Sequence, residues 1–349
     1  MLTLGQVEQV EHAPRARDPA GYHQMDIDSL HTRREASRLA VRRRRRRAAG
    51  LLAAVAAAAV AAVVLLSGSG GASGPRTSSV HTGGHSGHVA GGAGANAASR
   101  RGGGVRTGRP GGEPVPILMY HVIAAPPPGA PFPGLYVEPS QFAAQMRALK
   151  HAGWTAVTLD EVAAYWREGI SLPAGKPIVV SFDNGYHSQF TQALPVLERL
   201  GWVGDENIQL TGLPPSQGGL SEGEVRALIA AGWELDTQGT SHADLIKLDA
   251  LQLHEQVAGT RAILRRRYHV PLNWFCYPSG HYDATVVAAV AAAGYAGSTT
   301  VVPGWAHRSD DPYRLHRLRV LGGTSPAALL SLIAATQGDP PAPASYNGT

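Results

Sequence analysis

The stretch Pro177-Ile-Val-Val-Ser-Phe-Asp-Asn-Gly-Tyr186 decides the fold of this sequence. Its apolar and β-branched residues up to Phe182 predict a buried strand, and the Asp-Asn-Gly that follows predicts a turn. Parallel α/β folds place functional groups at the carboxyl ends of such strands. Asp183 stands at that end, so it is a candidate general base. The alternative is that Asp183 only caps the helix that follows the turn.

Strand-like and helix-like segments alternate on both sides of this stretch. Strands are expected near 115–120, 155–159, 233–237, 273–277, 295–300 and 315–321. Helices are expected near 140–149, from 160 onward, and near 187–200, 221–232, 247–267 and 283–294. This repeated order predicts a parallel sheet with helices outside it, closed as a barrel or open and doubly wound.

The segments before this region predict a membrane anchor. Residues 1–47 are polar and end in the run Arg42 to Arg47, which predicts a disordered basic tail. Residues 48–66 carry no charge and are about long enough to cross a bilayer as a helix. The positive-inside rule then places the N-terminus in the cytoplasm and the rest outside, as a single-pass protein of the cell membrane. A cleaved signal peptide is the alternative.

Two further segments predict little structure of their own. Residues 67–113 are rich in Gly and Ser and have the composition of a flexible linker. Residues 338–349 contain Pro, Gly and Ser and predict a disordered tail. The domain is therefore expected over residues 114–337.

Charge and cysteine content exclude some classes of protein. The net charge is +5, but much of the basic excess lies in the first fifty residues. The remaining charge is balanced and scattered, so a nucleic-acid partner is not expected. Cys276 is the only cysteine, so no intrachain disulfide can form.

Two more strand-to-turn segments carry polar side chains. One runs from Gly232 to Leu245 and holds Gln238 and His242; the other runs from Trp274 to Asp283 and includes a Pro-Ser-Gly turn. Taken singly, each pattern is as compatible with an ordinary turn as with a functional site.

Together and in this order, the motifs resemble those of a known family. Phe182-Asp-Asn-Gly-Tyr186, Gln238-Gly-Thr-Ser-His242 and Phe275-Cys-Tyr-Pro-Ser-Gly-His-Tyr-Asp283 are similar to the three motifs of the NodB-homology polysaccharide deacetylases, carbohydrate esterase family four. Pro116-Ile-Leu-Met-Tyr-His121 resembles the first strand of the subgroup that acts on poly-N-acetylglucosamine. The resemblance implies a distorted (β/α) barrel of the NodB type, an N-acetylated polysaccharide as partner, and a divalent metal, usually zinc.

The resemblance assigns a role to each motif position, and the metal positions depart from the family pattern. Asp183 keeps the position of the general base, while the metal positions read Asn184, Gln238 and His242 instead of Asp-His-His. Two neutral amides replace a carboxylate and an imidazole, so metal binding is expected to be weak.

The remaining roles fall on four residues. The Ser279 backbone N–H is the candidate oxyanion donor, His316 is the candidate general acid, and Tyr186 and Tyr277 are candidate substrate contacts. Three functions remain open: hydrolysis of N-acetyl groups on a cell-envelope glycan or exopolysaccharide, glycan binding by a pseudoenzyme without metal, and a purely structural role in the envelope.

Overall fold

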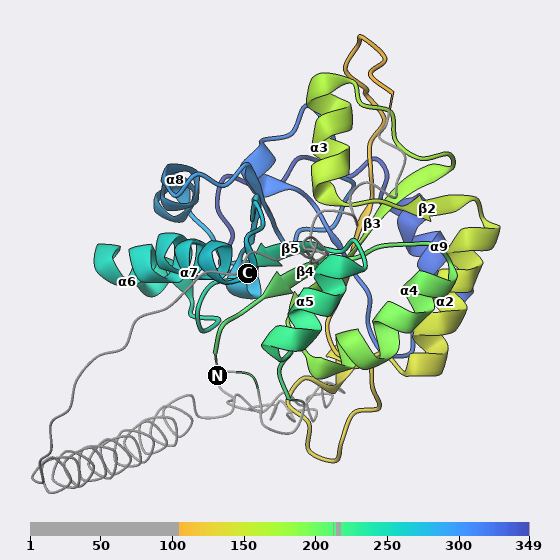
Figure 1. Cartoon of the computed structure of the whole chain (residues 1–349), viewed down its shortest axis with the longest axis horizontal. Helices are drawn as coiled ribbons and strands as arrows, with labels where there is room; N and C mark the ends of the chain where they lie inside the picture. The colour runs from red at the N-terminus through yellow and green to blue at the C-terminus, as the bar shows by residue number, and fades with distance from the viewer. Residues whose placement is uncertain (1–104, 212, 214–217, 349) are drawn as a thin grey trace, which may run out of the picture. The chain divides into compact units, whose positions relative to one another are not determined.

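The computed structural model describes residues 105–211, 213 and 218–348, and its centre is a sheet of eight parallel strands (Figure 1). The strands follow the order β7-β6-β5-β4-β3-β1-β8, and β2 pairs with the start of β3. Their bounds are β1 Ile117–Tyr120, β2 Trp154–Ala156, β3 Lys176–Asn184, β4 Asp205–Ile208, β5 Glu234–Thr237, β6 Trp274–Cys276, β7 Gly297–Thr299 and β8 Leu318–Arg319.

Helices surround the sheet, so the predicted alternation of strand and helix is confirmed (Figure 1). The Thr158 hydroxyl accepts the backbone N–H of Glu161, whose side chain accepts the Thr158 N–H; this capping box begins α3. Ser221 and Glu224 begin α5 in the same way. The helix bounds are α2 Pro139–His151, α3 Leu159–Glu168, α4 Leu194–Arg199, α5 Glu222–Ala230, α6 Ala250–His254, α7 Thr260–Tyr268, α8 Ala284–Ala292 and α9 Pro326–Ala335.

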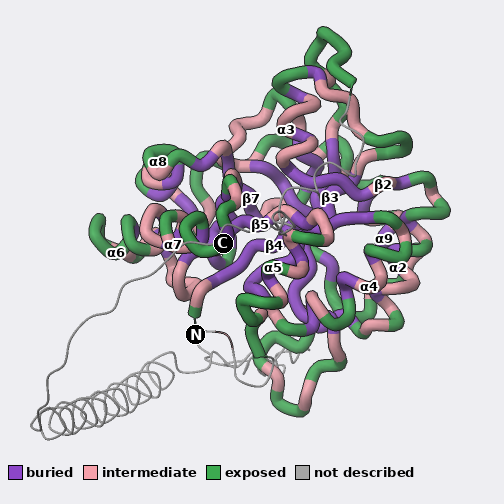
Figure 2. The backbone as a smooth tube through the Cα atoms, viewed as in Figure 1, coloured by how far each residue is buried: buried purple, intermediate pink, exposed green. Residues whose placement is uncertain are grey.

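The two faces of the sheet have different chemistry. On the helix side, Phe182 stacks on Trp233 with ring centroids 4.9 Å apart and on Tyr120 at 5.8 Å. On the opposite side of β3, Ser181 and Asp183 share a face because side chains alternate along a strand. Figure 2 shows that the strands are buried while the outer sides of the helices are exposed. Apolar packing therefore fills the space between sheet and helices, while the inner face combines polar groups with an apolar cluster that includes Ile117, Val179 and Trp274.

Backbone contacts bring the two ends of the strand order together. The Leu315 N–H donates to the Ser298 carbonyl of β7, and the Leu315 carbonyl accepts the Thr300 N–H. The same segment continues into β8, which pairs with β1. The sheet therefore curves into the distorted barrel that the sequence predicts, rather than remaining an open doubly wound sheet.

The structure changes the predicted boundaries of the domain at both ends. Residues 105–113, expected to be linker, pair with the end of α3: the Gly111 N–H donates to the Tyr165 carbonyl. Residues 338–348, expected to be a loose tail, pack on the domain because Tyr346 and Tyr282 exchange backbone hydrogen bonds of 2.9 Å. The Tyr282 hydroxyl also donates to the Pro343 carbonyl at 2.8 Å.

The predicted anchor at 48–66 lies outside the described residues, as do the tail 1–47 and most of the linker. Among the residues that the structure describes, no helix is both long and apolar enough to span a membrane.

Candidate active site

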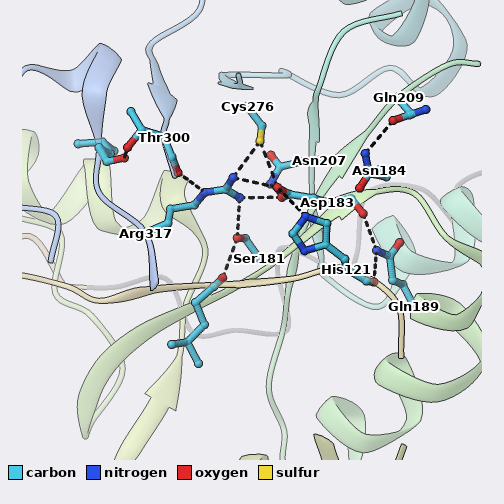
Figure 3. Close-up of polar contacts among 12 residues, drawn as sticks. His121, Ser181, Asp183, Asn184, Gln189, Asn207, Gln209, Cys276, Thr300 and Arg317 are labelled. Carbon is cyan, nitrogen blue, oxygen red and sulfur yellow. Dashed lines mark hydrogen bonds and ion pairs between the residues drawn. The ribbon is translucent and has the colours of Figure 1, made fainter. Parts of the chain in front are cut away.

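Asp183, the candidate base, lies at the end of β3 inside the barrel and is only 1% exposed. Arg317, from the segment before β8, donates to both carboxylate oxygens at 2.6 and 2.9 Å (Figure 3). The Asn207 amide of β4 donates to Oδ1 at 3.0 Å, and the Cys276 thiol of β6 lies 3.5 Å from Oδ2. Three separate segments of the barrel thus converge on one carboxylate.

This environment keeps Asp183 ionised. Burial by itself would raise the pKa of Asp183, but the charge and hydrogen bonds of Arg317 outweigh burial and lower that pKa to about 2. Burial also raises the pKa of the Cys276 thiol, so Cys276 contributes a neutral side chain to the cluster. A bidentate guanidinium pair of this kind fixes both the position and the charge of the carboxylate.

His121, directly after β1, completes the inner wall of the site. Its Nε2 lies 4.0 Å from Asp183 Oδ2, and its Nδ1 is buried without a hydrogen-bond partner. Burial lowers the pKa of His121 to about 4 against the opposing influence of Asp183, so the imidazole is neutral near pH 7. The Gln189 amide joins the two strand ends, since it donates to the carbonyls of His121 and Asp183 at 2.9 and 2.8 Å (Figure 3).

Of the three predicted metal positions, Asn184 ends β3 next to Asp183, and Gln238 and His242 follow β5. Asn184 adopts a left-handed φ of 79°, and its amide nitrogen donates to Gln209 Oε1 at 2.8 Å. Gln238 is 2% exposed, and its Oε1 is buried without a hydrogen-bond partner. His242 lies near enough to His121 that its charge would lower the pKa of His121.

These side chains do not make a zinc site of the kind that the family uses. Catalytic zinc takes three strong ligands from His, Cys or carboxylate side chains. Asn184 and Gln238 offer only neutral amide oxygens, and both oxygens of Asp183 already accept hydrogen bonds from Arg317. His242 is thus the one strong ligand among the three predicted metal positions.

Tyr186 belongs to the first motif and Ser279 to the third. Tyr186 is partly exposed, and Ser279 is exposed. Burial, together with Tyr136 and Asp183, raises the pKa of Tyr186 to about 12, so its hydroxyl stays protonated beside the carboxylate. Ser279 is exposed in the turn after β6, with a left-handed φ of 58°.

Tyr277 and His316 are directed elsewhere. Tyr277 is fully buried and its hydroxyl donates to the Tyr313 carbonyl at 3.0 Å. His316 is 2% exposed, and its Nε2 contacts the Pro340 carbonyl at 3.0 Å, under the C-terminal segment 338–348. Neither of these contacts involves Asp183, and the roles of substrate contact for Tyr277 and general acid for His316 stay predictions.

Sequence reasoning did not select the residues that contact Asp183 most closely. The sequence did carry a signal for Arg317, which directly follows His316. It is a charged residue within a strand-like apolar run. Asn207 and His121 carry weaker signals, since a polar residue at a strand end is common. Their roles depend on which strands are neighbours, and that information lies in the tertiary structure.

The fold, with its strand segments converging on Asp183, is similar to that of polysaccharide deacetylases. Residues 172–298 match the family profile described as polysaccharide deacetylase. YxkH of Bacillus subtilis, named as a polysaccharide deacetylase, is 27% identical over 215 residues. The aligned residues cover 61% of this chain and 74% of YxkH. The resemblance to polysaccharide deacetylases inferred from the motifs is confirmed.

Solved structures agree with this assignment. BC0361, a polysaccharide deacetylase from Bacillus cereus, is 26% identical with a TM-score of 0.56, over 63% of this chain and 69% of that chain. The Streptococcus pyogenes deacetylase PplD, solved in complex with acetate, is 25% identical with a TM-score of 0.58, over 64% of this chain and 99% of that chain. IcaB from Ammonifex degensii, at 20% identity and a TM-score of 0.52, shares the fold.

Replacing Arg317 by methionine should destabilise the domain strongly. The substitution leaves the Asp183 charge buried without its partner, which typically costs about 3–5 kcal/mol in the free energy of unfolding. Urea denaturation of the full chain measures the loss. The control is Arg106→Met, which removes an exposed ion pair with Glu168 and should cost at most about 1 kcal/mol. A loss for Arg317→Met as small as that of the control would contradict the role assigned to the pair.

Stability should fall in acid through Asp183. Its pKa is about 2 in the folded protein against 3.8 for the ordinary carboxyl, so the unfolded chain binds more protons between these values. The stabilisation is present above about pH 4 and is lost as the pH falls through 2, for a total of about 2 kcal/mol. Unfolding free energies from pH 5 to 2 should show this component in the natural sequence. The double variant Asp183→Asn/Arg317→Met should lack this pH-dependent component. Equal slopes of unfolding free energy against pH for both proteins would contradict the prediction.

Proposed function

We propose that this chain binds an N-acetylated polysaccharide of the cell envelope through its deacetylase site and has little or no zinc-dependent hydrolytic activity. The observation that carries the proposal is the set of side chains at the metal positions. Asn184 and Gln238 supply no charge to a cation, and Arg317 engages the carboxylate of Asp183. Enzymes of this family are generally metal-dependent, so weak metal binding removes the usual activation of water.

Several features support recognition of a glycan. The barrel and the motif order are those of a family that acts on N-acetylated polysaccharides. Tyr186 presents a protonated hydroxyl next to Asp183, and the turn at Ser279 is exposed. Hydroxyl and amide groups of this kind fit the polar, uncharged surface of an N-acetylated sugar.

Deacetylation by the chain as it stands is the second candidate. It is favoured by the retention of Asp183 together with neutral His121, whose Nε2 lies 4.0 Å away. A neutral imidazole in a buried site can accept a proton from water, and a fixed carboxylate can orient it. This arrangement would support slow hydrolysis.

Restoring the family ligands separates the two candidates. In the full chain, Asn184→Asp/Gln238→His should raise zinc affinity by more than ~100-fold. Even mutation of residues that only hydrogen-bond to metal ligands lowers metal affinity by about 10–100-fold. We expect about one equivalent of retained zinc and release of acetate from N-acetylglucosamine oligomers only in this double variant. The natural sequence should bind the same oligomers in calorimetry without releasing acetate. Gln337→His, which adds an exposed imidazole elsewhere, is the control for nonspecific metal binding.

Acetate release by the natural sequence decides against the binding proposal. If that release disappears in Asp183→Asn, the chain is an active deacetylase. If the double variant holds zinc but the natural sequence binds no oligomer, glycan recognition by this site is wrong.

We also infer that the domain lies outside the cell, anchored by residues 48–66. The charge pattern supports this orientation, because Arg42 to Arg47 precede the apolar segment and few charges follow it directly. In intact cells that express the full chain, protease added outside should degrade the domain. Protection until the membrane is permeabilised would place the domain inside.

A further inference from the structure

Phe132 is the only exposed aromatic side chain in the part of the chain that the structure describes. Its side chain is 75% exposed. It lies in the loop of residues 124–135, which connects β1 to α2 and projects from the domain (Figure 1). A single exposed apolar residue is common on protein surfaces, so exposure alone assigns no role to it. The backbone of Phe132 and the position of the loop provide the argument.

The backbone of Phe132 is held in a conformation that a bulky residue rarely adopts. Its φ of 59° and ψ of 57° lie in the left-handed region. Pro133 follows directly, and a residue before a proline favours an extended backbone instead. Glycine would occupy this position without strain. Strained residues persist only where the surrounding structure holds them, and they cluster at active sites and ligand-binding sites.

The loop around Phe132 is rigid. The Leu135 N–H donates to the Phe132 carbonyl at 3.0 Å, and the Gly322 N–H, after β8, donates to the Gly134 carbonyl at 2.9 Å. A side chain at Gly322 would overlap the Tyr136 carbonyl, so the two loops are in close contact. Prolines further restrict the backbone at positions 126, 127, 128, 131 and 133. A ligand that contacts the phenyl ring therefore has little loop ordering to cause on binding.

Both ends of the loop are fixed beside the first motif. The loop leaves the carboxyl end of β1, which pairs with β3, the strand of Asp183. The Ile123 N–H donates to Ser188 Oγ at 3.1 Å, two residues beyond Tyr186. At the other end of the loop, Tyr136 lies near enough to Tyr186 to raise the pKa of that hydroxyl. The exposed ring thus stands on the rim of the candidate site.

The chemistry of this rim fits a neutral sugar. The pyranose ring of N-acetylglucosamine carries its substituents around its edge, which leaves C–H groups on both faces. An aromatic ring offers a flat apolar face with π-electron density, against which such C–H groups pack. Leu321 is 42% exposed beside Gly134 and extends the apolar surface. Residues 124–135 include no charged side chain, so the loop matches an uncharged N-acetylated polymer.

We propose that Phe132 binds a pyranose ring of an N-acetylated polysaccharide by stacking, at a subsite one or more sugar units away from the unit beside Asp183. This inference rests on the proposed function, because it assigns a further part of the same glycan site. A polymer that passes Asp183 has additional rings to place on the rim, whereas a short ligand does not reach both positions. Stacking on Phe132 therefore adds affinity for long oligomers only.

The test measures the affinity of the full chain for the disaccharide and for a long oligomer of N-acetylglucosamine by calorimetry. Phe132→Ala should weaken binding of the long oligomer by about 3–10-fold, the range expected for one aromatic contact, and leave the disaccharide unchanged. Phe132→Trp should bind the long oligomer at least as tightly as the natural sequence does. Leu251→Ala removes another exposed apolar side chain, on α6, and is the matched control that should change neither affinity.

Phe132→Gly separates binding from a structural role. Glycine adopts the left-handed backbone without strain, so the melting temperature of the unliganded protein should stay the same or rise. The affinity for the long oligomer should nevertheless fall as it does in Phe132→Ala. A ring that serves only the fold would instead lower the melting temperature in both variants, and that result would overturn the inference.

The outcomes distinguish this inference from the proposed function. The inference is wrong, and the proposed function stands, if Phe132→Ala binds the long oligomer as tightly as the natural sequence does. It is also wrong if both ligands lose affinity equally. A change confined to the association state of the protein would make the loop a contact between copies and would equally contradict the inference. If the natural sequence binds no oligomer of any length, the proposed function and this inference fail together.

Discussion

The pair between Asp183 and Arg317 is the interaction on which the inside of this barrel depends. Asp183 lies near the end of β3, and Arg317 precedes β8, which only β1 separates from β3 in the strand order. Their hydrogen bonds cross the barrel and make the two segments one buried unit. Because neither side chain is exposed by more than 1%, each charge is tolerable only in the presence of the other. Closure of the barrel and the position of the candidate base thus have the same physical cause.

That pair also explains why the site resembles a deacetylase in shape more than in chemistry. The carboxylate is held in place by Arg317 and Asn207, and its oxygens already accept hydrogen bonds. In the family, a metal next to this carboxylate supplies activated water. Here the neighbouring positions are Asn184 and Gln238, whose neutral oxygens attract a dication weakly. In the proposed function, holding a sugar is therefore separable from cleaving its N-acetyl group.

The barrel interior holds more carboxyl groups than its arginine can pair with. Asp183 has a cationic partner, whereas Asp205, Glu234 and Asp236 have only backbone donors and one another. Burial and mutual repulsion raise the pKa of these three carboxyls, so they are neutral where Asp183 is charged.

The sequence by itself determined the family, the alternation of strands and helices, and the place of Asp183 at a strand end. These features depend on local patterns, such as apolar runs, caps and motif spacing, which are present in a linear string. Tertiary structure alone decided which side chains meet Asp183. Arg317 and His316 are adjacent in the sequence, but alternation along an extended segment sends one into the barrel and the other under residues 338–348. Asp205 and Asp236 come together for a similar reason, because strand register and not sequence distance places their carboxylates on one face.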